Sequence, residues 1–352
     1  MLGTQIRSNQ MKKDKLKDLL QEYRNAPKEF HATSYWDSYE KRILDTVCSI
    51  DLSRLRSGKY PILATFGFND SIYTYHPNLP FWKKAIRKFI HHYLIKHRSI
   101  LPYGIKISDI REIAYHHCEL IGNLSNAKSI STIEVSTFGC PQDVFEINGK
   151  KYTVAFLSYY LRYCFVQKHI SFKGDEIVVE LGSGSGYQIE VLKKLYPYIT
   201  VLCFDLPAQI YLCESYLSQA LGEENVVGTD VTLKWGNLSG IKKGRVHCFG
   251  NWQIPLLKDL QFDIFWNAAS FGEMEPDVVA NYLNYIKGNA RWIYLLQARH
   301  GKQTTGKTHV ENPITFDDYN ALLSGYIVRE EHKAWQAHKR LSGYFEGVWI
   351  KE

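Results

Sequence analysis

Three features that would point to a membrane or secreted protein are missing from this 352-residue chain. No apolar run approaches the roughly 20 residues that a membrane-spanning helix needs. The N-terminal residues lack the apolar core of a secretory signal peptide, and the seven cysteines are scattered without a C-x-x-C pair. We therefore expect a cytoplasmic protein with reduced cysteines, held by neither a disulfide frame nor a zinc site.

The chain does contain enough apolar sequence for a large core. Hydrophobic residues make up 45% and charged residues 22% of it, as in ordinary folded proteins. The net charge of +7 is uneven, since residues 1–100 hold 18 Lys/Arg against 9 Asp/Glu and the remainder holds 25 against 27. Solvated helix faces explain this basic region, and so does peripheral association with an anionic membrane surface. No basic-aromatic motif accompanies it, so no nucleic-acid partner is expected.

Two hydrophobic patterns divide the chain into two expected domains. Residues 1–172 read as a mainly helical acceptor-binding region that covers the site, with a basic helix over 81–97 and a hairpin turn at Asn148-Gly149. Over residues 173–352, strand-like and helix-like runs alternate, and two strand-like runs with a short link end the chain. This predicts an α/β, Rossmann-like sheet that is mostly parallel, with an antiparallel hairpin at its C-terminal edge.

Three glycines at alternate positions follow one strand-like run, in the sequence VVELGSGSG. A glycine-rich turn after a parallel strand allows a ligand to approach the backbone closely. Gly182 and Gly184 fit the dinucleotide pattern G-x-G-x-x-G, but Tyr187 stands where its third glycine belongs, and the last glycine is Gly186. Glu180 precedes the turn, and an acid there favours a cationic or hydroxyl-rich ligand over a pyrophosphate.

A second acid, Asp205, ends the next strand-like run. It stands 23 residues after Gly182, close to the roughly 20-residue spacing expected of an acid that binds ribose hydroxyls. One carboxylate can accept hydrogen bonds from two hydroxyl groups. A tight turn alone would explain the glycines, but it would explain neither of the two acids.

Together, E-x-G-x-G-x-G and Asp205-Leu206-Pro207 resemble the cofactor motifs of class I S-adenosylmethionine (SAM)-dependent methyltransferases. The resemblance implies SAM as the cofactor, with Glu180 near its methionine end and Asp205 on its ribose. It also implies adenine contacts after the third strand, where Asn251 could bond the ring edge and Trp252 could stack. NAD(P)-type binding and a non-catalytic use of the fold are the alternatives. The SAM-binding residues expected from the resemblance are Glu180, Gly182, Ser183, Gly184, Gly186, Asp205, Leu206, Asn251, Trp252 and Asn267.

The expected acceptor comes from the segment after the fourth strand. NAASFGEM, from Asn267 to Met274, and the PDVVANYLNYI that follows resemble a family of sugar O-methyltransferases, as does the upstream Tyr160-Leu161-Arg162. The resemblance spans about 130–300 and implies methylation of a hydroxyl group on a sugar or glycan. A polyketide, phenol or peptide acceptor is the alternative, and a nucleic acid is a weaker one, because the N-P-P-Y signature of base methylation is absent.

A sugar hydroxyl is a poor nucleophile that needs a base or a metal ion. Plant-type O-methyltransferases place a catalytic histidine where this chain has Gly272, so that base is missing. The candidate bases are Glu273 and His300, but Glu273 could instead cap the next helix and His300 could be an ordinary loop residue. Asp230 or Glu275 could hold Mg²⁺, although no spaced acidic cluster supports a metal site.

Overall fold

The computed structural model describes residues 2–32, 44–68, 70, 82, 85–86, 107–302, 310–336 and 339–352. Its centre is an eight-stranded sheet with the strand order β5-β6-β4-β3-β7-β8-β10-β9. Neighbouring strands are parallel except for the two pairs that involve β10. The strands are β3 (Ile177–Leu181), β4 (Thr200–Asp205), β5 (Val226–Val227), β6 (Val246–Gly250), β7 (Phe262–Ala268), β8 (Ala290–Ala298), β9 (Tyr326–Gln336) and β10 (Lys339–Lys351). The predicted α/β class, with a mostly parallel sheet and an antiparallel C-terminal hairpin, is confirmed.

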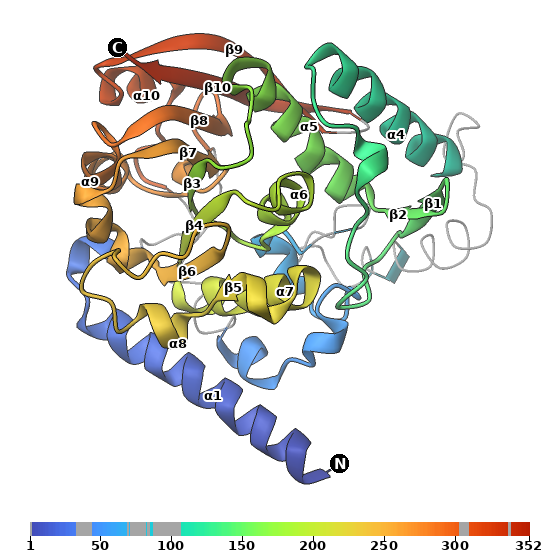
Figure 1. The fold of residues 1–352 in the computed structure, drawn as a ribbon, viewed down its shortest axis with the longest axis vertical. Helices are drawn as coiled ribbons and strands as arrows, with labels where there is room; N and C mark the ends of the chain where they lie inside the picture. Colours follow the sequence, from blue (N-terminus) through green and yellow to red (C-terminus); the bar gives the residue numbers. More distant parts are fainter. Residues whose placement is uncertain are drawn as a thin grey trace.

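Helices cover both faces of the sheet (Figure 1). Along β3, Val178 faces a core shared with α5, α6 and α7, whereas Val179 and Leu181 face a second core shared with α9 and α10. This division follows from the two-residue repeat of a strand, which turns successive side chains to opposite faces. The helices within residues 173–352 are α6 (Tyr187–Leu195), α7 (Pro207–Leu221), α8 (Thr229–Thr232), α9 (Pro276–Ile286) and α10 (Phe316–Leu322).

The N-terminal region also follows its pattern where the structure describes it. It contains α1 (Leu2–Asn25), α4 (Ile107–Leu124), α5 (Val154–Ile170) and a hairpin of β1 (Phe145–Ile147) and β2 (Lys150–Tyr152). Asn148 and Gly149 form the predicted turn with φ angles of 52° and 76°. The predicted basic helix over 81–97 lies largely outside the described residues. Of the described residues, no helix has both the length and the apolar character required to cross a membrane.

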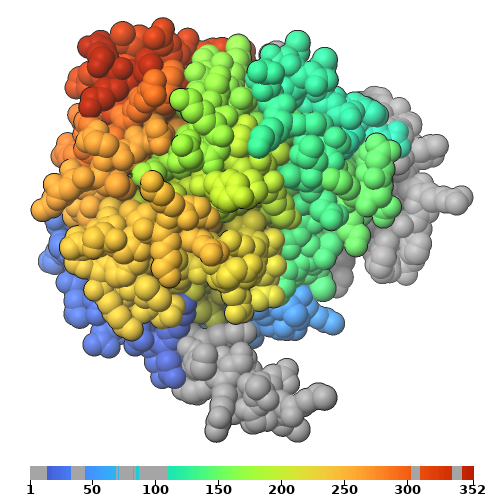
Figure 2. Space-filling model, in the orientation of Figure 1, coloured from blue at the N-terminus to red at the C-terminus, as the bar shows by residue number. Residues whose placement is uncertain are grey.

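The N-terminal region packs directly on the sheet and its helices. Leu16 and Leu19 of α1 are buried in the same apolar core as Val178 of β3. Lys15 forms ion pairs with Glu214 of α7 and with Asp230 of α8, the latter at 2.6 Å. In the space-filling view, the blue N-terminal residues border the yellow and orange residues of the sheet region (Figure 2). The two predicted regions therefore share one hydrophobic core.

Candidate active site

A cavity of about 300 Å³ opens at the carboxyl ends of β3, β4, β6 and β7. Ligands of open α/β sheets bind at this edge, where the strands end and loops diverge. Three short 3₁₀ helices add to its walls or border it: η1 (Lys28–Phe30), η3 (Pro61–Phe66) and η8 (Phe271–Glu273). Of the residues predicted from the sequence, those that line the cavity are Glu180, Gly182, Ser183, Gly184, Asp205, Leu206, Asn251 and Glu273.

Glu180 is the first of two buried acids in the cavity wall. It lies one residue before the end of β3, on the sheet face that carries Val178 and packs against α5. Its Oε2 atom is buried without a hydrogen-bond partner. Burial raises the pKa of the Glu180 carboxyl to about 8, against the opposing effects of Ser183 and Arg162. Burial therefore favours the neutral form of the Glu180 carboxyl.

Asp205, the second buried acid, ends β4 on the other side of the glycine loop. Its Oδ2 accepts a hydrogen bond from the Gly184 N–H at 2.7 Å, and its Oδ1 accepts one from the Leu206 N–H at 2.8 Å. Burial nevertheless raises the pKa of Asp205 to about 7. Each carboxylate oxygen keeps a further lone pair, so Asp205 can hold the loop and still accept hydrogen bonds from a ligand.

The glycine loop between these acids is covered by a distant segment of the chain. Gly184 has a left-handed φ of 51°, and a Cβ atom added there would lie 2.8 Å from the carbonyl oxygen of Phe66 in η3. Gly182 has a φ of 78°, and a Cβ atom there would collide with Ser270. Glycine is thus needed here for the close approach of the chain's own backbone as well as for a left-handed turn.

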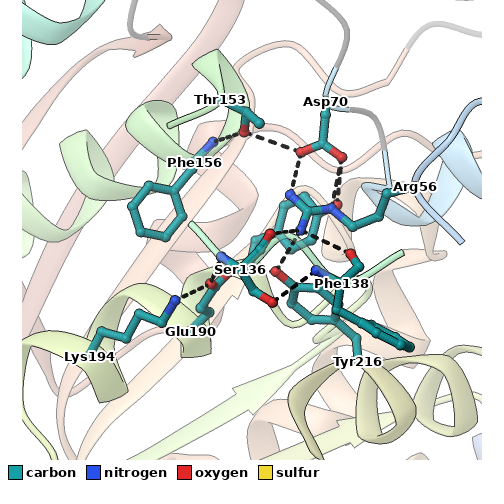
Figure 3. A network of polar contacts seen from close by, with 10 residues as sticks. Arg56, Asp70, Ser136, Phe138, Thr153, Phe156, Glu190, Lys194 and Tyr216 are labelled. Carbon is teal, nitrogen blue, oxygen red and sulfur yellow. Dashed lines mark hydrogen bonds and ion pairs between the residues drawn. The ribbon is translucent and has the colours of Figure 1, made fainter. Parts of the chain in front are cut away.

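A buried polar network holds this covering segment (Figure 3). Arg56 and Asp70, which flank η3, are both fully buried and form a two-pronged ion pair with distances of 2.9 and 2.7 Å. Arg56 also donates to Tyr216 of α7 at 3.1 Å, and Asp70 accepts from Tyr187 at 3.0 Å and from Thr153 at 3.2 Å. Because Tyr187 opens α6 directly after the loop, the network ties η3 to the helices that surround the cavity.

Several polar atoms in the cavity wall are buried without a partner in the protein. They are Glu180 Oε2, both amide atoms of Gln188, Asn251 Oδ1 and Arg162 Nε. The amide nitrogen of Asn251, in contrast, donates to the Phe30 carbonyl at 2.6 Å and to the Tyr282 hydroxyl at 2.8 Å. Buried polar groups are normally paired, so this concentration of unpaired atoms gives the cavity a lining that suits a polar ligand.

Four of the predicted residues lie outside the cavity lining. Gly186 is the N-cap of α6 and packs against Leu217 of α7. The Trp252 ring packs against Tyr23, with a centroid distance of 5.6 Å. Asn267 is buried beneath the site, where it donates to the Leu181 carbonyl at 2.9 Å and to Ser270 at 2.7 Å. His300 is exposed in the loop after β8.

The two alternatives for Glu273 are separated by its position. The N-cap of α9 is Glu275, so Glu273 does not cap this helix. Glu273 instead lines the cavity and forms an ion pair with Lys302. The two acids considered for magnesium are engaged elsewhere, since Asp230 pairs with Lys15 and Glu275 accepts hydrogen bonds from two backbone N–H groups.

Several residues of the cavity wall are not among those predicted from the sequence. Phe30 and His31 come from the N-terminal region and could not be placed without the fold. The imidazole of His31 bonds through Nε2 to the Ala26 carbonyl at 3.0 Å, which leaves Nδ1 as the acceptor of the neutral ring. Arg162 did carry a signal, because it is the only charged residue in the apolar run over 155–166.

Comparison with known proteins finds only low similarity, and only to solved structures. No family model and no curated protein matches the chain. Among solved structures, it is similar to a SAM-dependent methyltransferase from Aquifex aeolicus, with 15% identity, a TM-score of 0.35, and coverage of 53% of this chain and 87% of that one. It is also similar to the mitomycin 7-O-methyltransferase MmcR, with 11% identity, a TM-score of 0.37, and coverage of 56% and 57%. The pyocyanin biosynthetic protein PhzM shows 14% identity, a TM-score of 0.38, and coverage of 56% of each chain.

The chain therefore spans a little over half the length of the last two proteins. Identities and TM-scores this low assign no family.

Proposed function

We propose that this protein is a SAM-dependent O-methyltransferase whose acceptor is a hydroxyl group of a sugar or glycan. The observation that carries the proposal is the placement of two buried acids, Glu180 and Asp205, on either side of a glycine loop within one cavity. Neither acid is neutralised by a buried ion pair in the structure. A ligand with a cationic end and a diol end satisfies both acids, and SAM has this chemistry.

The unpaired atoms of the wall fit the parts of SAM. Asp205 would accept hydrogen bonds from the ribose hydroxyls through its remaining lone pairs. Asn251 presents only its oxygen, which would accept a hydrogen bond from the exocyclic amine of adenine. Leu206 and Tyr282 also line the cavity and supply apolar surface. When bound, SAM supplies a methyl group that its sulfonium makes electrophilic.

The chain's own contribution to transfer is to hold the acceptor hydroxyl and to receive its proton. Glu273 is the acid best placed for this role, because it lines the cavity and His300 does not. Its ion pair with Lys302 would keep the carboxylate oriented until an acceptor hydroxyl reaches it. General-base catalysis of this kind contributes about 10²- to 10⁴-fold to a rate.

The acceptor class rests on the NAASFGEM segment and on the wall it forms. Ala268, Ala269 and Ser270 from this segment line the cavity, and so does Tyr159. Aromatic rings stack on the apolar faces of sugars, while hydroxyl and carboxylate groups bond to their edges. A polyketide or phenol is the second candidate acceptor, because the same aromatic side chain suits a planar ring.

The test is transfer of a labelled methyl group from SAM to a panel of acceptors. The panel contains nucleotide-linked sugars, free glycosides, phenols and a nucleic acid, each with the purified full-length chain. We expect label in a sugar and release of S-adenosylhomocysteine (SAH) in equal amount. Label in a phenol alone would replace the acceptor class, and SAM binding without transfer to any acceptor would argue against catalysis.

A further inference from the structure

The turn that presents Glu273 to the cavity begins at a residue with an unusual backbone conformation. Ala269, directly after β7, has a left-handed φ of 69°, which residues other than glycine rarely adopt. Its N–H donates to the Leu296 carbonyl of β8 at 2.7 Å. The chain then forms η8, in which the Glu273 N–H donates to the Ser270 carbonyl at 3.0 Å. Such a conformation persists only where the surrounding structure fixes the backbone.

Two buried side-chain amides, those of Asn267 and Gln297, fix this turn. Both residues are 0% exposed. Gln297 of β8 accepts a hydrogen bond from the Gly272 N–H at 3.0 Å and donates one to the Asn267 Oδ1 at 2.6 Å. The same Oδ1 accepts a hydrogen bond from the Phe271 N–H at 3.2 Å. The two backbone N–H groups that precede Glu273 are therefore both held by side-chain amides.

The amide of Asn267 is fully used within the protein. Its nitrogen donates to the Leu181 carbonyl at 2.9 Å and to the Ser270 hydroxyl at 2.7 Å. Its oxygen accepts from Gln297 and from the Phe271 N–H, so both hydrogens and both lone pairs have partners. Loss of any member would leave a buried polar group unpaired, which ties the turn to β3 and β8.

These amides also decide which residue of the turn reaches the cavity. Gly272 is buried and is absent from the cavity lining, whereas Glu273 belongs to it. A Cβ atom added to Gly272 would lie 3.3 Å from the Gln297 Oε1. A side chain at position 272 would therefore meet β8, and the next residue supplies the carboxylate to the cavity.

We propose that Gln297, together with Asn267, is a positioning residue for catalysis, which holds the Phe271–Glu273 turn so that Glu273 faces the acceptor hydroxyl. This inference rests on the proposed function, because it deepens the role given there to Glu273. Strand β8 acts on this residue twice. Gln297 holds the backbone before it, and the loop after β8 carries Lys302, which pairs with its carboxylate.

Gln297→Met removes both hydrogen bonds of the amide and keeps most of the side-chain volume. We expect kcat to fall by about 10- to 100-fold, because a small misplacement of a catalytic group has an effect of this size. The dissociation constant for SAH should change less than about threefold, since Gln297 lies outside the cavity lining. Adding Gln297→Met to Glu273→Gln should lower kcat by less than about threefold further, because positioning contributes nothing once the base is gone.

Two controls separate positioning from general stability. Gln167→Met is matched, because Gln167 is also buried and accepts from the Phe172 N–H at 3.0 Å, outside the cavity lining. Its folded fraction should keep the kcat of the wild type. Gly272→Ala disturbs the contact with Gln297 without removing a polar group, should Gln297→Met fail to fold, and should also lower kcat. Gly236→Ala is its control, since the added atom there meets nothing within 4 Å.

Unchanged kcat in Gln297→Met, or in Gly272→Ala where the first variant does not fold, would overturn the positioning role. Losses that multiply in the double variant would do the same, because Gln297 would then act independently of Glu273. Crystal structures of the wild type and Gln297→Met provide a readout apart from activity. We expect the Glu273 carboxylate to shift in the variant, and an unmoved turn would contradict the proposal. A wild type that methylates no acceptor would overturn the proposed function instead, and the two structures would still decide the positioning.

Discussion

Glu180 and Asp205 are buried acids that share one cavity, and their burial has a measurable consequence for stability. The pKa of Glu180 in the folded protein, about 8, lies above the ordinary value for a glutamate. A raised carboxyl pKa contributes stability that is complete below the ordinary value and is lost as the pH rises through the folded-state pKa. The ligand-free protein should therefore lose stability from this group between about pH 4.5 and 8.

Glu180→Gln removes this titration while keeping the shape of the side chain. Between pH 5.5 and 7.5, the free energy of unfolding of the wild type should fall relative to that of the variant by about 1 kcal/mol per pH unit. Urea denaturation of both proteins at three pH values measures the difference. Parallel pH dependences for the two proteins would show that Glu180 is already charged in the ligand-free cavity.

Glu273 is the second residue with a specific prediction, this time for turnover. Glu273→Gln cannot accept a proton but preserves the size of the side chain. We expect kcat to fall by about 10²- to 10⁴-fold while the dissociation constant for SAH changes less than threefold. Glu275→Gln is the control, since Glu275 is two residues away and accepts hydrogen bonds from the Glu311 and Asn312 N–H groups. Full activity in Glu273→Gln would move the base elsewhere, with His31 the next residue to test.

At the scale of elements, the glycine loop and η3 are in direct contact. Gly184→Ala adds a methyl group 2.8 Å from the Phe66 carbonyl, on a backbone with a left-handed φ. Gly149→Ala is a matched control, because Gly149 has a φ of 76° and nothing within 4 Å of the added atom. The control should cost about 1 kcal/mol of stability from backbone strain alone, whereas Gly184→Ala should cost about 2–4 kcal/mol. Denaturant titration measures both losses. If Gly184→Ala and Gly149→Ala lose the same free energy of unfolding, η3 does not pack closely against the loop.

The same covering segment depends on the Arg56–Asp70 pair (Figure 3). Arg56→Met leaves the charge of Asp70 buried and uncompensated, which should cost about 3–5 kcal/mol in the free energy of unfolding. Lys258→Met removes one member of an exposed pair and should cost less than about 1 kcal/mol. Chemical denaturation of both variants and of the wild type measures the two losses. A small loss for Arg56→Met would mean that the network does not hold η3.

The elements themselves were largely predictable from the sequence. The strands β3, β4 and β6 to β10 follow apolar runs and turn signals, whereas the two-residue β5 was not predicted. A mostly parallel sheet follows from strands joined by helices, but the order of its strands was not predicted. The glycine loop was predictable as part of the cavity lining but not as a contact of η3, because Phe66 and Gly184 are more than 100 residues apart. Such a meeting is set by tertiary packing, which local patterns do not encode.

At the scale of the whole molecule, the site is assembled from both halves of the chain. Glu180, Asp205 and Asn251 could be found because each lies within one residue of the C-terminal end of a strand, and parallel strands end at one edge. Trp252 was expected beside the ligand, yet its ring packs on Tyr23 of α1. Its neighbour in sequence, Asn251, faces the cavity instead, and the N-terminal region supplies Phe30 and His31 to the same wall.

The central claim is that the cavity between Glu180 and Asp205 binds a sulfonium nucleoside, and titration calorimetry tests it most directly. SAH and NAD⁺ are titrated separately into the wild type, Asp205→Ala and the control Asp259→Ala, whose acid is exposed. We predict one site for SAH, a loss of about 10- to 100-fold in affinity for Asp205→Ala only, and no binding of NAD⁺. Binding of NAD⁺, or SAH affinity unaffected by Asp205→Ala, would contradict the account.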